Sequence, residues 1–199
     1  MRELWLTRNT LIEMLTERGY TTSQTTTNYQ SFIEQFSSAA SNTALLNFVC
    51  SKNNIPLAVH FTSEDKLSKK SLEALASDYS VQGVSTVVLI TPNKLNPACK
   101  ALLKSIKLNF EHFLIEELQF NITKHCLVPK HRIMSEEEQI AFLEKMKCQK
   151  VNIPTILTVD PVSRFFGAKP GNIFEITRTS QTTGTALYYR VVREPGMKQ

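Results

Sequence analysis

The clearest chemical signal in this 199-residue chain is an acidic-basic triplet, Glu64-Asp65-Lys66, at the end of a predicted strand. The E-x-K spacing is typical of half of a restriction-nuclease-like site. The other half needs an acidic residue on the preceding strand to hold a divalent cation. The chain has three aspartates, Asp65, Asp78 and Asp160, so none lies on a strand before the triplet. Glu34 is a poor substitute because it lies in a helical pattern. A metal-dependent nuclease therefore remains an alternative, but we predict no catalytic residue.

Other patterns of catalysis or cofactor binding do not occur in the sequence. It contains no G-x-S-x-G, Walker or G-x-G-x-x-G motif. With six glycines in the chain, a phosphate cradle of backbone N–H groups is not expected. The histidines occur singly, at His60, His112, His125 and His131. His125 beside Cys126 lacks the further ligands of a zinc site, so we predict neither metal nor cofactor.

The composition is that of a mildly basic globular protein. Lysine and arginine total 23 against 18 acidic residues, for a net charge of +5. This balance permits contact with nucleic acid without demonstrating it. No apolar run of about 18 residues is present, and the first residues carry charge where a signal peptide is apolar. The four isolated cysteines indicate reduced thiols. We expect an intracellular protein with no membrane partner.

The first 120 residues or so have the pattern of a three-layer α/β unit. Apolar residues at helical spacing predict four helices, over 4–18, 29–36, 68–79 and 97–106. Short apolar runs predict strands at 44–50, 55–61 and 84–90. Asn53-Asn54 favours a hairpin turn between the first two strands. The segment 110–123 is predicted to be extended.

The remaining residues predict a smaller domain, so that we expect a division into residues 1–122 and 123–199. Ser135 and Glu138 match a helix capping box. Asp160 is a good N-cap for a short helix with Pro161 at its first position, and Gly167 can end that helix in the left-handed conformation. A turn is predicted at 169–171, and extended segments at 124–134, 155–159, 172–178 and 186–193.

Residues 122–192 resemble the shared small subunit of archaeal and eukaryotic RNA polymerases, which in eukaryotes is the fifth subunit and is common to the three nuclear enzymes. The family pattern runs through H-x-L-V-P-x-H, then D-P-V-A-R-Y-x-G-x-K-R-G, then a Y-R strand. The matching positions include His125, Leu127, Val128, Pro129, His131, Pro154, Ile156, Asp160, Pro161, Val162, Arg164, Gly167, Lys169, Gly171, Ile176, Arg178, Tyr189 and Arg190. A weaker resemblance covers the N-terminal part, through the Trp5 helix and the segment TPNKLNPACKALL.

The resemblance implies a non-catalytic, two-domain polymerase subunit without a cofactor. Its N-terminal jaw would contain a restriction-nuclease-like sheet without an active site and line the cleft for downstream double-stranded DNA. The DNA-proximal candidates are Lys94, Pro97 and Lys100. A small mixed-sheet C-terminal domain would dock on the largest subunit and its neighbours. The implied assembly motif comprises Pro129, His131, Asp160, Pro161, Arg164, Gly167, Lys169, Gly171, Arg178, Tyr189 and Arg190. The arginines could either contact the partner subunit or form ion pairs within this chain.

Three positions depart from the family pattern. Pro170 and Thr185 replace arginines, and Gln181 replaces a glutamate. Such departures are typical of a divergent lineage, such as a large DNA virus or a protist. The resemblance implies the nucleus as the location, or a cytoplasmic viral factory or virion for a viral protein. A free-standing regulator that binds the polymerase is a further alternative.

Overall fold

The computed structural model describes residues 1–39, 42–63, 67–180 and 184–196. The chain divides into two compact units, Met1–Phe120 and Asn121–Gln199, here called unit 1 and unit 2. The division lies two residues before the boundary expected from the sequence. In the described part of the chain, no helix is long and apolar enough to cross a membrane.

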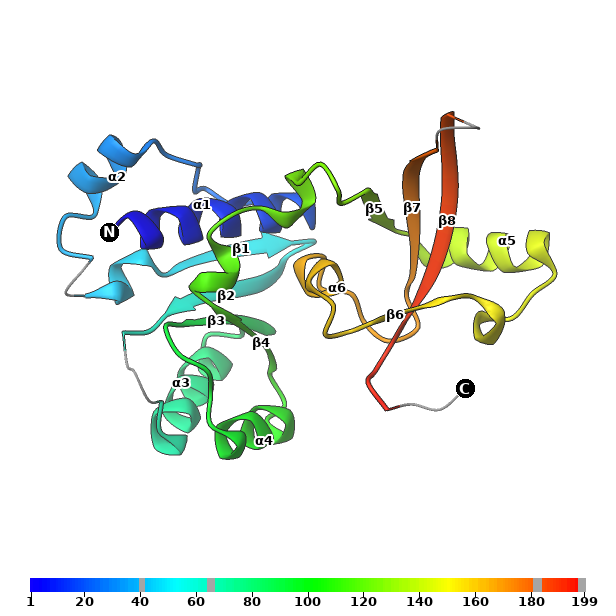
Figure 1. Cartoon of the computed structure of the whole chain (residues 1–199). Helices are drawn as coiled ribbons and strands as arrows, with labels where there is room; N and C mark the ends of the chain where they lie inside the picture. The colour runs from blue at the N-terminus through cyan, green and yellow to red at the C-terminus, as the bar shows by residue number, and fades with distance from the viewer. Residues whose placement is uncertain (40–41, 64–66, 181–183, 197–199) are drawn as a thin grey trace. The chain divides into compact units, whose positions relative to one another are not determined.

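Unit 1 is built on a four-stranded mixed sheet in the order β1-β2-β3-β4 (Figure 1). The strands are β1 (Phe48–Lys52), β2 (Ile55–Phe61), β3 (Thr86–Thr91) and β4 (Asn109–Leu114). Strand β1 runs antiparallel to β2, whereas β2, β3 and β4 are parallel. Asn53 and Asn54 have φ angles of 52° and 63°, which confirms the hairpin turn that the two asparagines predict.

Helices cover both faces of this sheet. They are α1 (Arg2–Glu17), α2 (Tyr29–Gln35), α3 (Lys69–Val81) and α4 (Pro97–Ser105). Figure 1 shows α1 and α2 on one side and α3 with α4 on the other. Leu11 and Leu15 of α1 are fully buried, and Leu72 of α3 packs with Leu89 of β3 and Cys99 of α4. The predicted α/β unit is therefore present.

Two segments of unit 1 that were predicted to be extended are 3₁₀ helices over part of their length. Residues Thr43–Leu46 form a 3₁₀ helix, η1, because the Asn42 side chain accepts a hydrogen bond from the Ala44 N–H (3.1 Å). Strand β4 stops at Leu114, whose N–H donates to the Glu117 carboxylate (2.9 Å), and the 3₁₀ helix η2 (Glu116–Leu118) follows. In both cases a polar side chain provides a local partner that competes with the sheet ladder.

Unit 2 is a second mixed sheet, in the order β5-β7-β8-β6. Its strands are β5 (Lys130–Ile133), β6 (Thr155–Leu157), β7 (Ile173–Ser180) and β8 (Gly184–Arg193). Among the described strands of unit 2, β6 and β8 form a parallel pair, whereas β5–β7 and β7–β8 are antiparallel. Two α-helices, α5 (Glu136–Met146) and α6 (Pro161–Phe165), and two 3₁₀ helices, η3 (Ile122–Lys124) and η4 (Lys150–Asn152), complete the unit.

The sheet of unit 2 has a small apolar core on each face. On one side Ile173 and Val191 pack with Phe142 and Leu143 of α5. On the other side the core consists of Ile156, Phe174, Ile176 and Val192, with Phe166 and Ala168 packed against it from the end of α6. Neighbouring residues of a strand point to opposite faces, so the fully buried pair Ile173 and Phe174 anchors β7 in both cores.

The helix ends of unit 2 follow the signals in the sequence. Ser135 and Glu138 form the predicted capping box at the start of α5. The Asp160 carboxylate accepts a hydrogen bond from the Val162 N–H (2.9 Å) and caps α6, with Pro161 in its first turn. Gly167 ends this helix at φ 62°, a conformation that costs glycine little. Local sequence therefore determines where α5 and α6 begin and where α6 ends.

Candidate partner-docking groove

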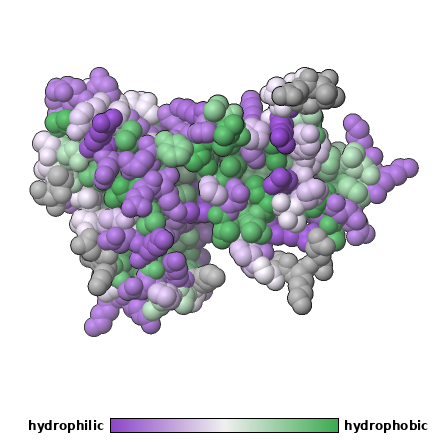
Figure 2. Space-filling model, viewed as in Figure 1, coloured by the Kyte–Doolittle hydropathy of each residue, from purple (hydrophilic) through white to green (hydrophobic). Residues whose placement is uncertain are grey.

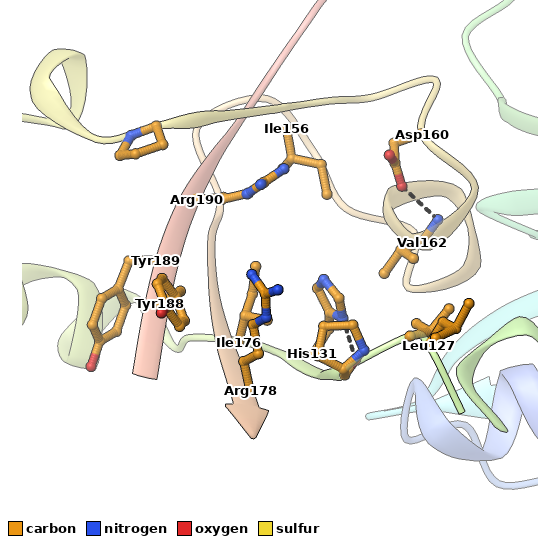
Figure 3. Close-up of a pocket in the computed structure, with 13 residues that line it drawn as sticks. Leu127, His131, Ile156, Asp160, Val162, Ile176, Arg178, Tyr188, Tyr189 and Arg190 are labelled. Carbon is orange, nitrogen blue, oxygen red and sulfur yellow. Dashed lines mark hydrogen bonds between the residues drawn. The ribbon is translucent and has the colours of Figure 1, made fainter. Parts of the chain in front are cut away.

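A groove of about 480 Å³ opens on the face of the unit 2 sheet that carries Ile176 (Figure 3). One wall is the segment before and within β5, with Leu127, Val128, Pro129 and His131. The opposite wall runs from β6 to α6, with Pro154, Ile156, Asp160 and Val162. Strands β7 and β8 supply the remaining lining through Ile176, Arg178, Tyr188, Tyr189 and Arg190. Residues from five segments of the chain thus meet at one place.

Strand register explains why two arginines face this groove. Phe174 is paired with Arg190, Ile176 with Tyr188, and Arg178 with Ala186. Residues paired across a ladder share a face, as do alternate residues of one strand. Arg178, Tyr188 and Arg190 therefore project on the same side as Ile176, and Figure 3 shows both guanidinium groups in the groove.

Both arginines are exposed, and neither guanidinium forms an ion pair or hydrogen bond with any residue that the structure describes. This contrasts with Arg132 on β5, which pairs with Glu138 (2.7 Å) and Glu175 (3.0 Å). Charge-assisted hydrogen bonds to carboxylates are the strong interactions of a guanidinium. The groove therefore has free capacity to bind an anionic group.

His131 has a defined tautomer. Its Nδ1 lies 2.6 Å from the Pro129 carbonyl oxygen, so Nδ1 carries the proton and donates, and in the neutral ring Nε2 is an acceptor. Burial lowers the pKa of His131, and the Arg190 charge acts in the same direction, whereas the Pro129 hydrogen bond and the Asp160 charge oppose them. The imidazole is thus kept neutral, and its ring packs edge-on against Phe174 with centroids 5.7 Å apart.

The rim of the groove includes an unusually exposed apolar residue. Leu127 has 82% of its surface exposed. The turn that presents it is held by the His125 carbonyl, which accepts from the Val128 N–H (2.9 Å), and by His125 Nδ1, which accepts from the Leu127 N–H (3.2 Å). Figure 2 also shows apolar residues gathered in the region of α6. The backbone turn is thus fixed by hydrogen bonds, and it presents an exposed apolar side chain beside the two arginines.

The predicted assembly motif falls into two groups. Six of its members line the groove, namely Pro129, His131, Asp160, Arg178, Tyr189 and Arg190. The other five, Pro161, Arg164, Gly167, Lys169 and Gly171, lie in α6 and the turn that follows it. That turn is tied to β8, because the Gly171 N–H donates to the Val192 carbonyl (2.9 Å) and the Val192 N–H donates to the Asn172 carbonyl (2.8 Å). The second group shapes the surface that the first group lines.

Sequence reasoning chose Tyr189 and missed Tyr188. The Tyr189 ring packs against Phe142 of α5, with centroids 4.1 Å apart, and only borders the groove. Tyr188 is paired with Ile176 and has 48% of its surface exposed, on the groove side. The alternation of β8 was the available signal, because a position that shares a face with Arg190 lies two residues away from it.

The DNA-proximal candidates lie together at one end of unit 1. Lys94 is in the loop between β3 and α4, Pro97 is the first residue of α4, and Lys100 is one turn further, and all three are exposed. Leu95 and Cys99 between them are buried, at 7% and 2% exposure. This alternation turns the lysines outward. The structure therefore brings the three candidates to one surface.

No nuclease or metal site emerges from the described residues. The Glu64-Asp65-Lys66 triplet lies outside them, and they contain no group of three or more His, Cys, Asp or Glu side chains placed to hold a metal ion. A pocket of about 470 Å³ in unit 1 lies between the β1–β2 hairpin and α3. In it His60 Nδ1 lies 3.1 Å from the Tyr79 hydroxyl, and burial lowers the His60 pKa. No predicted site residue lines this pocket.

We expect His131 to make unit 2 less stable in mild acid. Its folded-state pKa is below the ordinary histidine value of about 6.5, so the unfolded chain binds more protons as the pH falls through that value. The free energy of unfolding then decreases as the pH falls below about 6.5. Urea unfolding curves followed by circular dichroism at pH 7.5 and 5.5 measure this loss. His131→Asn keeps a donor near the Nδ1 position and does not titrate, so an equal pH dependence in this variant would contradict the assignment.

Two family models match the chain. One is described as the RNA polymerase Rpb5 N-terminal domain, over residues 1–78, and the other as the Rpb5 C-terminal domain, over residues 120–192. Both describe a component of a multisubunit DNA-directed RNA polymerase. Subunit RPABC1 of RNA polymerases I, II and III from Caenorhabditis briggsae is 31% identical over 200 residues, which cover 95% of each chain. The chain therefore belongs to the Rpb5 family of non-catalytic RNA polymerase subunits.

Two further relatives show how the similarity is distributed. The Dictyostelium discoideum RPABC1 subunit is 28% identical over 193 residues, or 92% of this chain and 94% of that protein. RNA polymerase subunit Rpo5 of Pyrococcus horikoshii is 55% identical over 76 residues, which are 38% of this chain but 93% of the archaeal protein. The archaeal relative thus corresponds to less than half of this chain at higher identity, while the eukaryotic relatives extend over both units.

Proposed function

We propose that unit 2 docks this subunit on the largest subunit of its RNA polymerase through the groove between β5, α6 and β7–β8. The observation that carries the proposal is that six residues of the assembly motif, spread from Pro129 to Arg190, line this one groove. The exposed Leu127 and the two free arginines give it the mixture of apolar and charged groups that is typical of interface hot spots.

We further propose that unit 1 is the jaw that lines the downstream-DNA cleft. Its support is the outward placement of Lys94, Pro97 and Lys100 by the buried residues Leu95 and Cys99. Lysines at a helix start contact phosphates without reading sequence. The proposed location is the nucleus, or a cytoplasmic viral factory or the virion if the protein is viral.

Affinity purification of a tagged copy from its native source tests the docking proposal. The amounts of all recovered polypeptides are measured by quantitative mass spectrometry. The expected result is one copy of this subunit per copy of each of the two largest polymerase subunits. A free-standing regulator would instead be recovered at a trace ratio to the polymerase subunits, and the polymerase would retain its own fifth subunit. Recovery of the tagged chain alone would overturn the proposal.

Charge reversal tests the DNA-proximal surface. Lys94→Glu combined with Lys100→Glu is expected to reduce crosslinking of downstream DNA to this subunit several-fold in the assembled polymerase. Each lost phosphate contact also lowers the salt dependence of log K by about 0.9, so the slope falls by about 2. Crosslinking yield at several salt concentrations provides both readouts.

Lys69→Glu with Lys70→Glu is the matched control, because it reverses two exposed lysines of α3 in the same unit. It should leave the crosslinking yield and its salt slope unchanged. Equal losses in both double variants would show that the crosslink reports only the overall charge of unit 1 and not this surface.

A further inference from the structure

The groove on unit 2 carries more cationic charge than the chain itself balances. Arg178 and Arg190 face it without an ion pair to any residue in the described ranges. The one carboxylate in the lining belongs to Asp160, and it already accepts the capping hydrogen bond of α6. Water solvates both guanidinium groups in the free chain, and a docked anion would pair with them once the groove is covered.

We propose that the groove binds an acidic polypeptide segment, which places carboxylate side chains at Arg178 and Arg190 and an apolar side chain between them. The inference rests on the docking function proposed above and names the chemistry of the segment that docks. The two arginines lie on either side of the Ile176–Tyr188 pair, so acidic side chains flank a position that is apolar and aromatic.

The rest of the lining favours a polypeptide over nucleic acid. Ile156 and Ile176 are buried, and Leu127 stands 82% exposed at the rim. The exposed Leu127 side chain gains from being covered by aliphatic side chains, which a phosphodiester backbone does not provide. Tyr188, half exposed between the two arginines, is of a type enriched in protein interfaces. A volume of about 480 Å³ accommodates a few side chains of a single segment.

His131 and Asp160 determine at which end of the groove the acidic side chains of the docked segment can lie. The Asp160 carboxylate repels a second carboxylate, and the neutral His131 ring offers Nε2 as an acceptor because Nδ1 donates to the Pro129 oxygen. At this end the docked segment therefore presents hydrogen-bond donors, such as backbone N–H groups. The acidic side chains face the β7–β8 wall, where Arg178 and Arg190 lie.

Substitution of the arginines tests the proposal in the assembled polymerase. Arg178→Glu and Arg190→Glu, each alone, are expected to reduce co-purification of the largest subunit about 30-fold or more, the loss typical of truncating one partner of a buried charge pair. Lys145→Glu is the control, because this exposed lysine lies on α5, the helix packed on the other face of the sheet. Circular dichroism of the purified chains verifies that each variant is folded.

Zero-length coupling identifies the acidic partner directly. Arg178→Lys or Arg190→Lys introduces an amine that a carbodiimide joins to a carboxylate in contact with it. In the purified complex we expect an isopeptide bond from either position to an aspartate or glutamate of a polymerase subunit, located by mass spectrometry. Unchanged co-purification of the Glu variants with no such bond would overturn the acidic segment while leaving docking intact. Loss of the association on nuclease treatment would overturn it in favour of nucleic acid. Failure of the wild-type chain to co-purify would instead refute the docking function.

Discussion

Phe174→Ala is expected to destabilise unit 2 strongly while leaving the stability of unit 1 unchanged. The Phe174 side chain is fully buried in β7, with ring centroids 5.7 Å from His131 and 5.8 Å from Phe166. Truncating a buried phenylalanine typically costs about 3–5 kcal/mol. A small domain is stable by only about 5–15 kcal/mol, so a large part of the stability of unit 2 is lost.

Thiol labelling in urea separates the two units. Cys148 packs against the core of unit 2 on the α5 side, and Cys50 is buried in unit 1, where burial raises its pKa to about 11. In Phe174→Ala the labelling midpoint of Cys148 should fall by about 2–5 M urea, at an m-value of about 1–1.5 kcal/mol/M. The Cys50 midpoint should stay in place. If both midpoints moved together, the two units would be unfolding as one.

Phe120→Ala is the matched control for this experiment. Its side chain is 58% exposed, so removing the ring leaves no cavity and should move neither midpoint appreciably. A large shift of either midpoint in the control would show that the loss in Phe174→Ala does not depend on the burial of the ring.

Local signals were sufficient to predict most elements of both units. Capping residues decide where α5 and α6 begin, and the Asn53-Asn54 pair decides where the β1–β2 hairpin turns, because each acts on its own neighbours in the chain. The arrangement of strands was not predictable in the same way. That β6 pairs parallel with β8 depends on contacts between distant segments, and no local pattern encodes them.

In the candidate groove, too, the residues could be predicted from the sequence but their arrangement could not. The resemblance supplied Asp160, Arg178 and Arg190 without showing that they meet, and only the register of β7 against β8 puts both arginines on the Ile176 face. It also named five residues that build α6 and its turn, which a sequence motif cannot distinguish from contact residues. Family motifs mark what is constrained, and geometry separates shape from contact.

Helical spacing of apolar residues does not by itself show which of them are buried on α5. Phe142 and Leu143 pack on the sheet, but Ile140 and Met146 have 59% and 57% of their surfaces exposed. In unit 1, conversely, the charged residues Arg8 and Arg18 of the first helix region are buried, at 3% and 9% exposure. Arg8 lies over the Phe36 ring at 4.8 Å, a cation–π contact that offsets part of its desolvation. Such pairings appear only once the chain is folded.

Arg18 provides the second large effect, in unit 1. Its guanidinium, with 5% of the side chain exposed, lies 2.8 Å from the Glu111 carboxylate of β4 and joins the end of α1 to the sheet. Removing one partner of a buried ion pair leaves an uncompensated charge, at a cost of about 3–5 kcal/mol. Arg18→Ala should therefore lower the urea midpoint of Cys50 labelling strongly and leave the Cys148 midpoint unchanged.

Two further variants show whether the cost comes from the orphaned charge. Arg18→Met combined with Glu111→Leu removes both charges and keeps most of the volume, so it should recover most of the stability that Arg18→Ala loses. In unit 2, Arg132→Ala breaks the more exposed ion pairs to Glu138 and Glu175, in which the Arg132 side chain is 48% exposed. Water replaces the lost partner there, so a much smaller change of the Cys148 midpoint is expected. If the double variant were as unstable as Arg18→Ala, the pair would stabilise unit 1 through its own attraction, and the desolvation argument would be wrong.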